Sequence, residues 1–235
     1  WLIFKIAGLK VFVFHFGDDV RYRPIINKIN QYLNNSLAFE EEPYLCTKRY
    51  FLDKLVSQKT SEWFSTYLLT NNDQSTFLSK SEYEFNVPYI AIVEKPKEPN
   101  QVITFLHAPS NRRVKDTATV LSAIEQLKAE GYNFNFVLLE NTQNTNVLMQ
   151  LVATDVLIDQ AGDGLGGLSK EGLSSGCFLI TGMQTSKWKA IVPHLHFERY
   201  DVVLLKQNIV KCIKDRDWLA EQMKKSFDIF DRANI

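Results

Sequence analysis

The clearest chemical pattern in this chain lies in residues 155–175, DVLIDQAGDGLGGLSKEGLSS. An apolar segment is followed by a glycine-rich loop and then by an expected helix that begins near Leu168 and carries Glu171. Glycine has no Cβ, so a ligand can approach the backbone closely. The first amides of a helix lack intrahelical partners and carry partial positive charge, which suits them to bind phosphate. The sequence therefore predicts a phosphorylated ligand at this loop.

The loop fits two kinds of nucleotide site. Gly162, Gly164 and Gly167 satisfy the G-x-G-x-x-G spacing of dinucleotide-binding proteins. Such a site also requires an acidic residue about 20 positions further on to bind the ribose hydroxyls, and the segment CFLITGMQTSKW contains none. The second kind of site uses two carboxylates, and Asp163 and Glu171 are separated by seven residues. At about two helical turns apart, they are expected to bind different hydroxyl groups around one phosphate.

With the segment before it, this pattern resembles the carboxy-terminal domain of retaining GT-B glycosyltransferases of the large group 1 (GT4-like) family. The resemblance runs from residues 103–141 through TDVLIDQ and DGLGGLSKEGLSSG. In that family an E-x7-E motif binds a nucleoside diphosphate sugar, which implies that Asp163 contacts the sugar and Glu171 the ribose. The backbone amides implied to face the diphosphate belong to Gly164, Gly166 and Gly167. Asp163 is one methylene shorter than the family's glutamate, which puts the donor sugar and full activity in question.

The resemblance also implies two cations after the first strand of this domain, which neutralise the diphosphate and stabilise charge on the leaving group. The segment SNRRVKD supplies Arg112, Arg113 and Lys115. Arg113 and Lys115 are the expected catalytic cations, because the arginine and lysine of the family flank the strand-to-helix turn, and Arg112 is kept as an alternative. Without that context, these side chains would be interpreted as solvated charges of a loop.

A second, partial match lies in residues 15–21, HFGDDVR. It is similar to the family segment around H-G-S-D, at the cleft that faces donor sugar or acceptor, and implies that His15 and Gly17 bind substrate. The family's histidine directly precedes the glycine, whereas Phe16 does so here. On a strand this shift points His15 to the opposite face, so a buried histidine is the alternative. His107 is likewise either a neighbour of the phosphates or a core histidine.

The alternation of apolar and amphipathic segments predicts an α/β fold with a Rossmann-like parallel sheet covered on both faces. Strands are expected in residues 9–16, 64–71, 102–108, 133–140, 155–160, 177–182 and 201–205. Helices are expected over residues 116–130, 144–152, from Leu168 onward, and from about 207 to 232. Ligands of such sheets bind at the carboxyl ends of the strands, where Asp163 and Arg113 both lie.

Two domains are expected. The segment VPYIAIVEKPKEPNQ contains three prolines and several charges, which predicts a linker near residues 88–101. Residues 1–92 resemble only the final part of an amino-terminal, acceptor-side domain, which is the end of a second Rossmann-like domain. Residues 93–235 form the expected nucleotide-sugar-binding domain, whose closing helix in the family packs back toward the first domain.

Composition narrows the functional classes. With 27 basic and 27 acidic residues the net charge is zero, so no nucleic-acid partner is expected. The three cysteines are widely spaced, which indicates neither a disulfide framework nor a structural zinc site and favours a cytoplasmic setting. His194 and His196 lack an evident third ligand, so no metal is expected. Lys5 and Lys10 interrupt the apolar opening segment, which is therefore too short to span a membrane.

The resemblance implies an enzyme that transfers a hexose-type group from a nucleoside diphosphate sugar to a hydroxyl, with retention and without metal or other cofactor. The expected acceptor is a glycan or a lipid-linked glycan of the cell surface. The aromatic-rich opening residues fit either a core strand or a surface that lies peripherally against a membrane, and the sequence leaves both open. Two alternatives are a catalytically inactive member that still binds a nucleotide sugar and a sugar-nucleotide epimerase of similar architecture.

Overall fold

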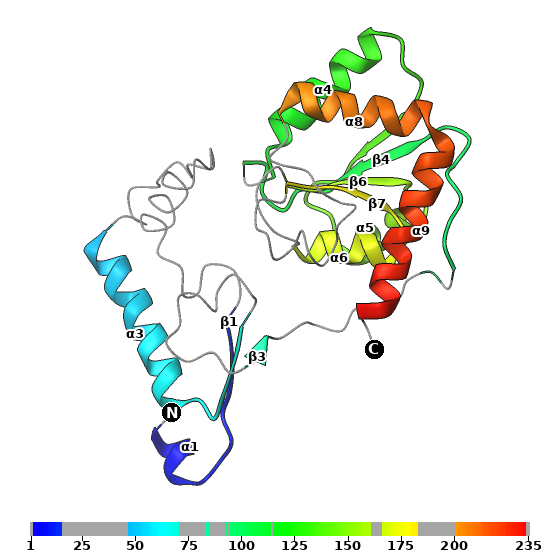
Figure 1. The fold of residues 1–235 in the computed structure, drawn as a ribbon. Helices are drawn as coiled ribbons and strands as arrows, with labels where there is room; N and C mark the ends of the chain where they lie inside the picture. The colour runs from blue at the N-terminus through cyan, green and yellow to red at the C-terminus, as the bar shows by residue number, and fades with distance from the viewer. Residues whose placement is uncertain are drawn as a thin grey trace. The chain divides into compact units, whose positions relative to one another are not determined.

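A computed structural model describes residues 2–15, 47–70, 83–84, 93, 95–113, 115–160, 166–182 and 201–233 of this chain. The chain divides into two compact units, Trp1–Val87 and Pro88–Ile235 (Figure 1). The division falls just before the segment that the prolines indicate as a linker. The more detailed assignment of residues 1–92 and 93–235 to an acceptor-side and a donor-side domain stays a prediction.

The first unit contains a parallel sheet with the strand order β1-β2-β3. Its described elements are α1 (Leu2–Ile6), β1 (Phe12–His15), α3 (Lys48–Phe64), β2 (Tyr67–Thr70) and β3 (Tyr83–Glu84). Strands β1 and β2 lie inside the two apolar segments predicted as strands. Helix α3 begins where the Thr47 hydroxyl accepts a hydrogen bond from the Tyr50 amide at 3.1 Å, which satisfies one of the unpaired amides of its first turn.

The second unit contains a four-stranded, fully parallel sheet with the order β5-β4-β6-β7. Its strands are β4 (Thr104–His107), β5 (Asn135–Leu138), β6 (Val156–Ile158) and β7 (Phe178–Ile180). Its helices are α4 (Thr117–Ala129), α5 (Asn144–Val152), α6 (Gly167–Ser174), α8 (Val202–Lys214) and α9 (Arg216–Ala233). The predicted α/β class with parallel sheets is therefore confirmed.

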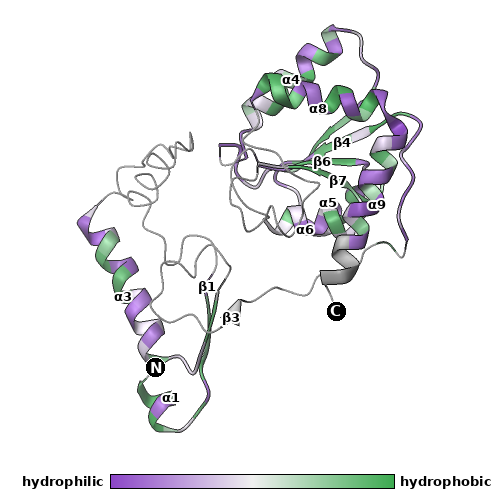
Figure 2. Ribbon diagram, in the orientation of Figure 1, coloured by the Kyte–Doolittle hydropathy of each residue, from purple (hydrophilic) through white to green (hydrophobic). Residues whose placement is uncertain are grey.

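Helices cover both faces of this sheet, with α4 and α8 side by side on one face and α5 and α6 on the other (Figure 1). The central strands are largely hydrophobic, whereas the helices alternate between hydrophobic and hydrophilic residues (Figure 2). In α4 the buried stripe follows the helical period and consists of Val120, Ala123, Ile124 and Leu127. The helix ends before Gly131, whose φ of +83° is accessible to glycine without strain. One buried apolar core thus fixes the sheet and the loops at its edges.

Helix α6 packs especially closely against strand β6. A Cβ added at Gly172 would lie 2.5 Å from Cδ2 of Leu157, a fully buried side chain of β6. Since real side-chain atoms do not approach so closely, glycine at this position lets the helix sit near the strand. This contact helps to fix the position of the first turn of α6.

Two expectations for the carboxy-terminal residues are wrong. Residues 201–205, DVVLL, were expected to form a strand, but Asp201 caps helix α8 by accepting a hydrogen bond from the Leu204 amide at 2.8 Å. The buried residues of α8 follow a helical rather than an alternating period, namely Leu205, Ile209 and Cys212. The single closing helix expected from about 207 to 232 is two helices, divided at Asp215, whose carboxylate accepts from the Trp218 amide at 3.1 Å.

The segment that leads into β4 is attached to the amino-terminal edge of the sheet. The Asp155 carboxylate, before β6, accepts hydrogen bonds from the Asn100 amide at 2.9 Å, the Asn100 side chain at 3.0 Å and the Thr104 amide at 2.7 Å. The Lys97 ammonium donates to the carbonyls of Leu151 at 3.0 Å and Thr154 at 2.7 Å, at the carboxyl end of α5. These contacts lie at the edge opposite to the one where the predicted ligand site falls.

Candidate functional site

The candidate site lies at the carboxyl ends of strands β4 and β6, which are neighbours in the sheet. The loop after β4 contains the predicted cations Arg112, Arg113 and Lys115. Strand β6 is followed by Asp159 and Gln160, and helix α6 begins at Gly167. In a parallel sheet, the strand order places these segments next to each other although about fifty residues of sequence separate them.

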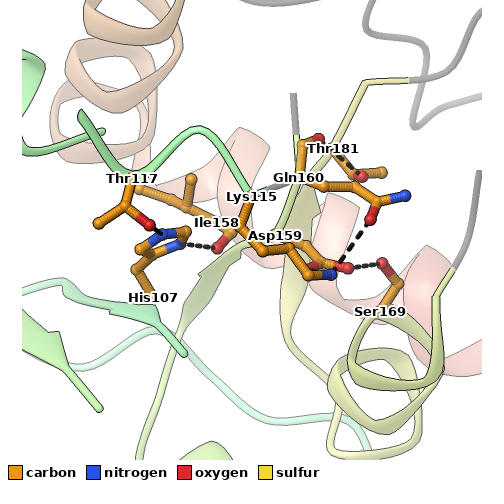
Figure 3. A network of polar contacts seen from close by, with 8 residues as sticks. All are labelled: His107, Lys115, Thr117, Ile158, Asp159, Gln160, Ser169 and Thr181. Atoms are coloured by element: carbon orange, nitrogen blue, oxygen red, sulfur yellow. Dashed lines mark hydrogen bonds and ion pairs between the residues drawn. The ribbon is translucent and has the colours of Figure 1, made fainter. Parts of the chain in front are cut away.

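The side chain of Lys115 lies at the centre of a buried polar network (Figure 3). Its ammonium forms an ion pair with Oδ1 of Asp159 and donates a hydrogen bond to Oε1 of Gln160 at 3.2 Å. The Lys115 side chain is 10% exposed and that of Asp159 is fully buried. Because burial reduces the screening of charges by water, this pair is held more firmly than an exposed pair would be.

The network connects the two loops to helix α6. The second carboxylate oxygen of Asp159 accepts a hydrogen bond from the hydroxyl of Ser169, in the first turn of that helix. The carbonyl of Gln160 accepts from the Thr181 hydroxyl at 3.2 Å, just after β7 (Figure 3). Asp159 thus joins the loop after β4, the end of β6 and the beginning of α6.

The amino terminus of α6 lies next to Lys115. A Cβ added at Gly166, the residue that precedes the helix, would lie 3.7 Å from Nζ of Lys115 and 3.8 Å from Oδ2 of Asp159. The predicted meeting of a lysine from the loop after β4 with the glycine-containing helix terminus is therefore present in the structure. An ammonium beside the unpaired amides of a helix terminus can bind an anionic group.

His107, the last residue of β4, is fully buried and lies beside these contacts (Figure 3). Its Nδ1 lies 2.8 Å from the Ile158 carbonyl, which can only accept, so Nδ1 carries the proton. Its Nε2 lies 3.0 Å from the Thr117 hydroxyl, which donates to it in the neutral ring. Burial lowers the pKa of His107 despite this carbonyl contact. Both ring nitrogens are used within the protein, which agrees with the core-histidine interpretation.

The two arginines of the loop lie differently from Lys115. Arg112 makes a bidentate contact with Glu140, with both N–O distances at 2.6 Å, and its side chain is 61% exposed. The hydrogen bonds from Arg112 lower the pKa of Glu140. Arg113 is exposed, and its backbone amide donates to the Asn111 side chain at 3.0 Å. Their contacts with a diphosphate stay predictions.

Glu171 lies in the second turn of α6 and is half-buried. Its Oε1 accepts a hydrogen bond from the side-chain amide of Asn144 at 3.1 Å. Asn144 is the first residue of α5, which follows β5, so this contact also lies at the carboxyl edge of the sheet. The predicted contact of Glu171 with a ribose stays a prediction.

The remaining predicted site residues are only partly covered by the structure. His15 is buried at the end of β1, opposite Thr70 in the strand register, and its predicted sugar contact stays a prediction. Asp163, Gly164 and Gly17 lie outside the described residues, as does the H-x-H pair. Within the described part of the chain, no group of three histidine, cysteine or acidic side chains is placed to hold a metal ion.

Sequence reasoning missed the polar residues that connect the predicted ones. Asp159, Gln160 and Ser169 were not predicted as site residues, and neither was Asn144, the partner of Glu171. The available signal was the position of Asp159 and Gln160 directly after an apolar strand, where a polar pair falls at the ligand-binding edge of a parallel sheet.

The fold is similar to two solved structures. WaaG, a glycosyltransferase involved in lipopolysaccharide biosynthesis, aligns with a TM-score of 0.59 and 15% sequence identity over 99% of this chain and 79% of WaaG. A chain of the GtfA/B complex aligns with a TM-score of 0.54 and 12% identity over 74% of this chain. This chain spans 44% of the length of that GtfA/B chain. No protein-family model and no curated protein matches the sequence.

The fold is of the GT-B type. At such low sequence identities the likeness establishes the arrangement of strands and helices alone, and the predicted fold class agrees with it. A fold of this kind supports many chemistries, so the function is inferred from the site itself. No helix among the described residues has the length and apolar character needed to cross a membrane.

Proposed function

We propose that this protein is a glycosyltransferase that takes a sugar from a nucleoside diphosphate sugar and passes it to a hydroxyl acceptor. The observation that supports this most directly is the position of the Lys115 ammonium at the amino terminus of α6. A cation and a set of unpaired helix amides together suit a diphosphate. The likeness of the fold to WaaG agrees with this proposal.

In this proposal the predicted residues of the second unit have distinct roles. Lys115, with Arg113 or Arg112, stabilises the departing diphosphate, and the amides of the glycine loop contribute further hydrogen bonds. Glu171 binds the ribose hydroxyls, for which Asn144 already fixes one of its carboxylate oxygens. Asp163 orients the sugar. Transfer proceeds with retention of the anomeric configuration. It requires no metal, because the cations and the helix terminus supply the positive charge.

The proposed acceptor is a glycan or a lipid-linked glycan of the cell surface. A feature that fits a lipid-linked acceptor is the group of exposed apolar side chains near the start of the chain: Leu2, Ile3, Phe4, Ile6, Leu9, Phe12 and Phe14. The neighbouring Lys5 and Lys10 carry positive charge. Apolar and basic side chains in combination suit peripheral contact with a membrane, which is part of the proposal.

Turnover can be tested by incubating the protein with a panel of nucleoside diphosphate sugars and following release of the nucleoside diphosphate. Release, with transfer of the sugar to an added glycan acceptor, is the expected result. Binding without release would support an inactive nucleotide-sugar-binding protein instead. Conversion of the sugar while it remains attached to the nucleotide would indicate an epimerase.

The role of Glu171 has a sharper test. Glu171→Ala is expected to abolish the rise in melting temperature that a nucleoside diphosphate gives to the unsubstituted protein, because the ribose loses its carboxylate partner. Glu130→Ala is the matched control, since Glu130 caps the carboxyl end of α4 and pairs on the surface with Lys206. Equal stabilisation of both variants by the nucleotide would refute the assignment of Glu171.

A further inference from the structure

The Lys115 ammonium has two hydrogen-bond partners among the residues that the structure describes. An ammonium group carries three N–H donors, and two of them are used by Oδ1 of Asp159 and Oε1 of Gln160 (Figure 3). Within the described part of the chain, Nζ has no third partner. Nζ also lies beside Gly166, the residue before α6, where an added Cβ would be 3.7 Å from it. The third N–H is therefore available to a ligand at the start of α6.

The charge of Lys115 is already compensated. Asp159 is fully buried, and both of its carboxylate oxygens are engaged, one by Lys115 and one by the Ser169 hydroxyl. An ion pair has no net charge, and breaking it here would leave a carboxylate buried without its cation, which is strongly unfavourable. A ligand at α6 thus meets a well-placed hydrogen-bond donor with much of its positive charge cancelled.

We propose that Asp159 is a positioning residue that aims the Lys115 ammonium at the diphosphate while limiting the attraction between them. This inference rests on the proposed function, because it takes Lys115 to face a diphosphate. A nucleoside diphosphate released after sugar transfer gains a terminal phosphate with an additional ionisation near neutral pH, so it is more negatively charged than the donor. A fully charged lysine would hold this product more tightly than the donor. The buried carboxylate reduces that difference and favours product release.

The decisive variant is Asp159→Asn, which keeps the shape of the side chain and one oxygen acceptor but removes its charge. Lys115 then acts with its full charge, so the Kd for a nucleoside diphosphate is expected to fall about three- to tenfold. Binding is also expected to weaken more steeply with added salt than in the unsubstituted protein. UDP, GDP and ADP serve as probes, measured by calorimetry at low and at high salt.

Asp155→Asn is the matched control. Asp155 stands just before β6 and Asp159 just after it, and Asp155 is only 2% exposed. The substitution is chemically the same and disturbs a comparable set of hydrogen bonds, but at the opposite edge of the sheet. It is expected to lower stability while leaving both the Kd and its salt dependence unchanged.

A double variant keeps the test valid if Asp159→Asn does not fold. Lys115→Met combined with Asp159→Asn has no buried charge, and replacement of a buried ion pair by neutral groups is often tolerated. Its salt dependence of binding is expected to equal that of the unsubstituted protein. A clearly shallower dependence would mean that Lys115 acts with its full charge, and would overturn the inference.

The outcomes separate this inference from the proposed function. If the unsubstituted protein binds neither these three nucleotides nor any other nucleoside diphosphate, the proposed function is wrong and this inference falls with it. If the protein binds one of them and Asp159→Asn binds it equally or more weakly, only the inference is overturned. Tighter, more salt-dependent binding by Asp159→Asn alone, and not by Asp155→Asn, supports it.

Discussion

Removal of the Asp155 carboxylate should destabilise the protein strongly without involving the ligand site. This side chain accepts three hydrogen bonds, two from Asn100 and one from the Thr104 amide, at 2.7 to 3.0 Å. It thereby ties Asn100, in the segment that leads into β4, and the first residue of β4 to the beginning of β6. In Asp155→Ala, the Thr104 amide is left buried without an acceptor.

The magnitude follows from the burial of each bond. A hydrogen bond to a charged group contributes about 1.5–3 kcal/mol, and a buried donor left without a partner costs a similar amount. The bond to Thr104 is fully buried, whereas those to Asn100 are partly buried and open to replacement by water. Counting the Asn100 bonds at half value gives a loss of about 3–6 kcal/mol in the free energy of unfolding. At about 2–4 °C for each kcal/mol, the melting temperature falls by at least roughly 6 °C.

Urea unfolding and thermal melting of the full chain, followed by circular dichroism, measure this loss. Asp201→Ala is the control, because Asp201 is an exposed carboxylate with a single hydrogen bond that caps α8, and loss of a cap costs about 1 kcal/mol. If Asp155→Ala loses no more stability than Asp201→Ala, the burial argument is wrong. The use of Asp155→Asn as a control for binding would then also lose its basis.

Two further predictions concern other buried groups. Burial lowers the pKa of His107 below that of the unfolded chain, so its contribution to stability is complete above a pH of about 6.5 and declines as the pH falls. The difference in the free energy of unfolding between the unsubstituted protein and His107→Asn, measured with urea, should therefore become smaller from pH 7.5 to pH 5.5. Parallel pH profiles of the two proteins would contradict this. Lys97 donates to three carbonyls at the carboxyl end of α5, at 2.7 to 3.3 Å, so Lys97→Met should lower the free energy of unfolding by about 1–3 kcal/mol. Lys128→Met, at an exposed lysine in the last turn of α4, should change it by less than about 0.5 kcal/mol, and equal losses in the two variants would refute the assignment of Lys97.

Most elements of the second unit could be predicted from the sequence because local pattern and tertiary packing agree there. Helix α5 has the predicted bounds of 144–152, and α4 differs from its prediction by one residue at each end. The beginning of α8 was missed because its valines and leucines form a short apolar run, which periodicity alone does not assign to strand or helix. Asp201, which precedes this run and caps the helix, was the signal that should have decided it.

For the site, sequence reasoning identified residues expected to touch the ligand but not the side chains that hold them in place. The resemblance to a family pointed to Lys115 and Glu171, since its motifs mark residues expected to touch the ligand. Asp159 and Ser169 instead hold a neighbouring side chain. Such a partner is determined by which side chains meet in three dimensions. Neither its charge nor its spacing distinguishes it from an ordinary polar residue at the end of a strand.

The sheet order explains why this network forms at all. Strand β4 pairs with β6 in parallel, so their carboxyl ends emerge side by side, and the long side chain of Lys115 in the first loop reaches the residues that follow the second strand. A lysine placed there beside apolar neighbours alone would be an uncompensated buried charge, which lowers the stability of the fold. A carboxylate at the end of β6 resolves this difficulty, but the same carboxylate must also oppose any anion that the lysine binds. The folding requirement and the binding requirement therefore act on one residue, Asp159. Its substitution should lower the stability of the fold and raise the affinity for the nucleotide.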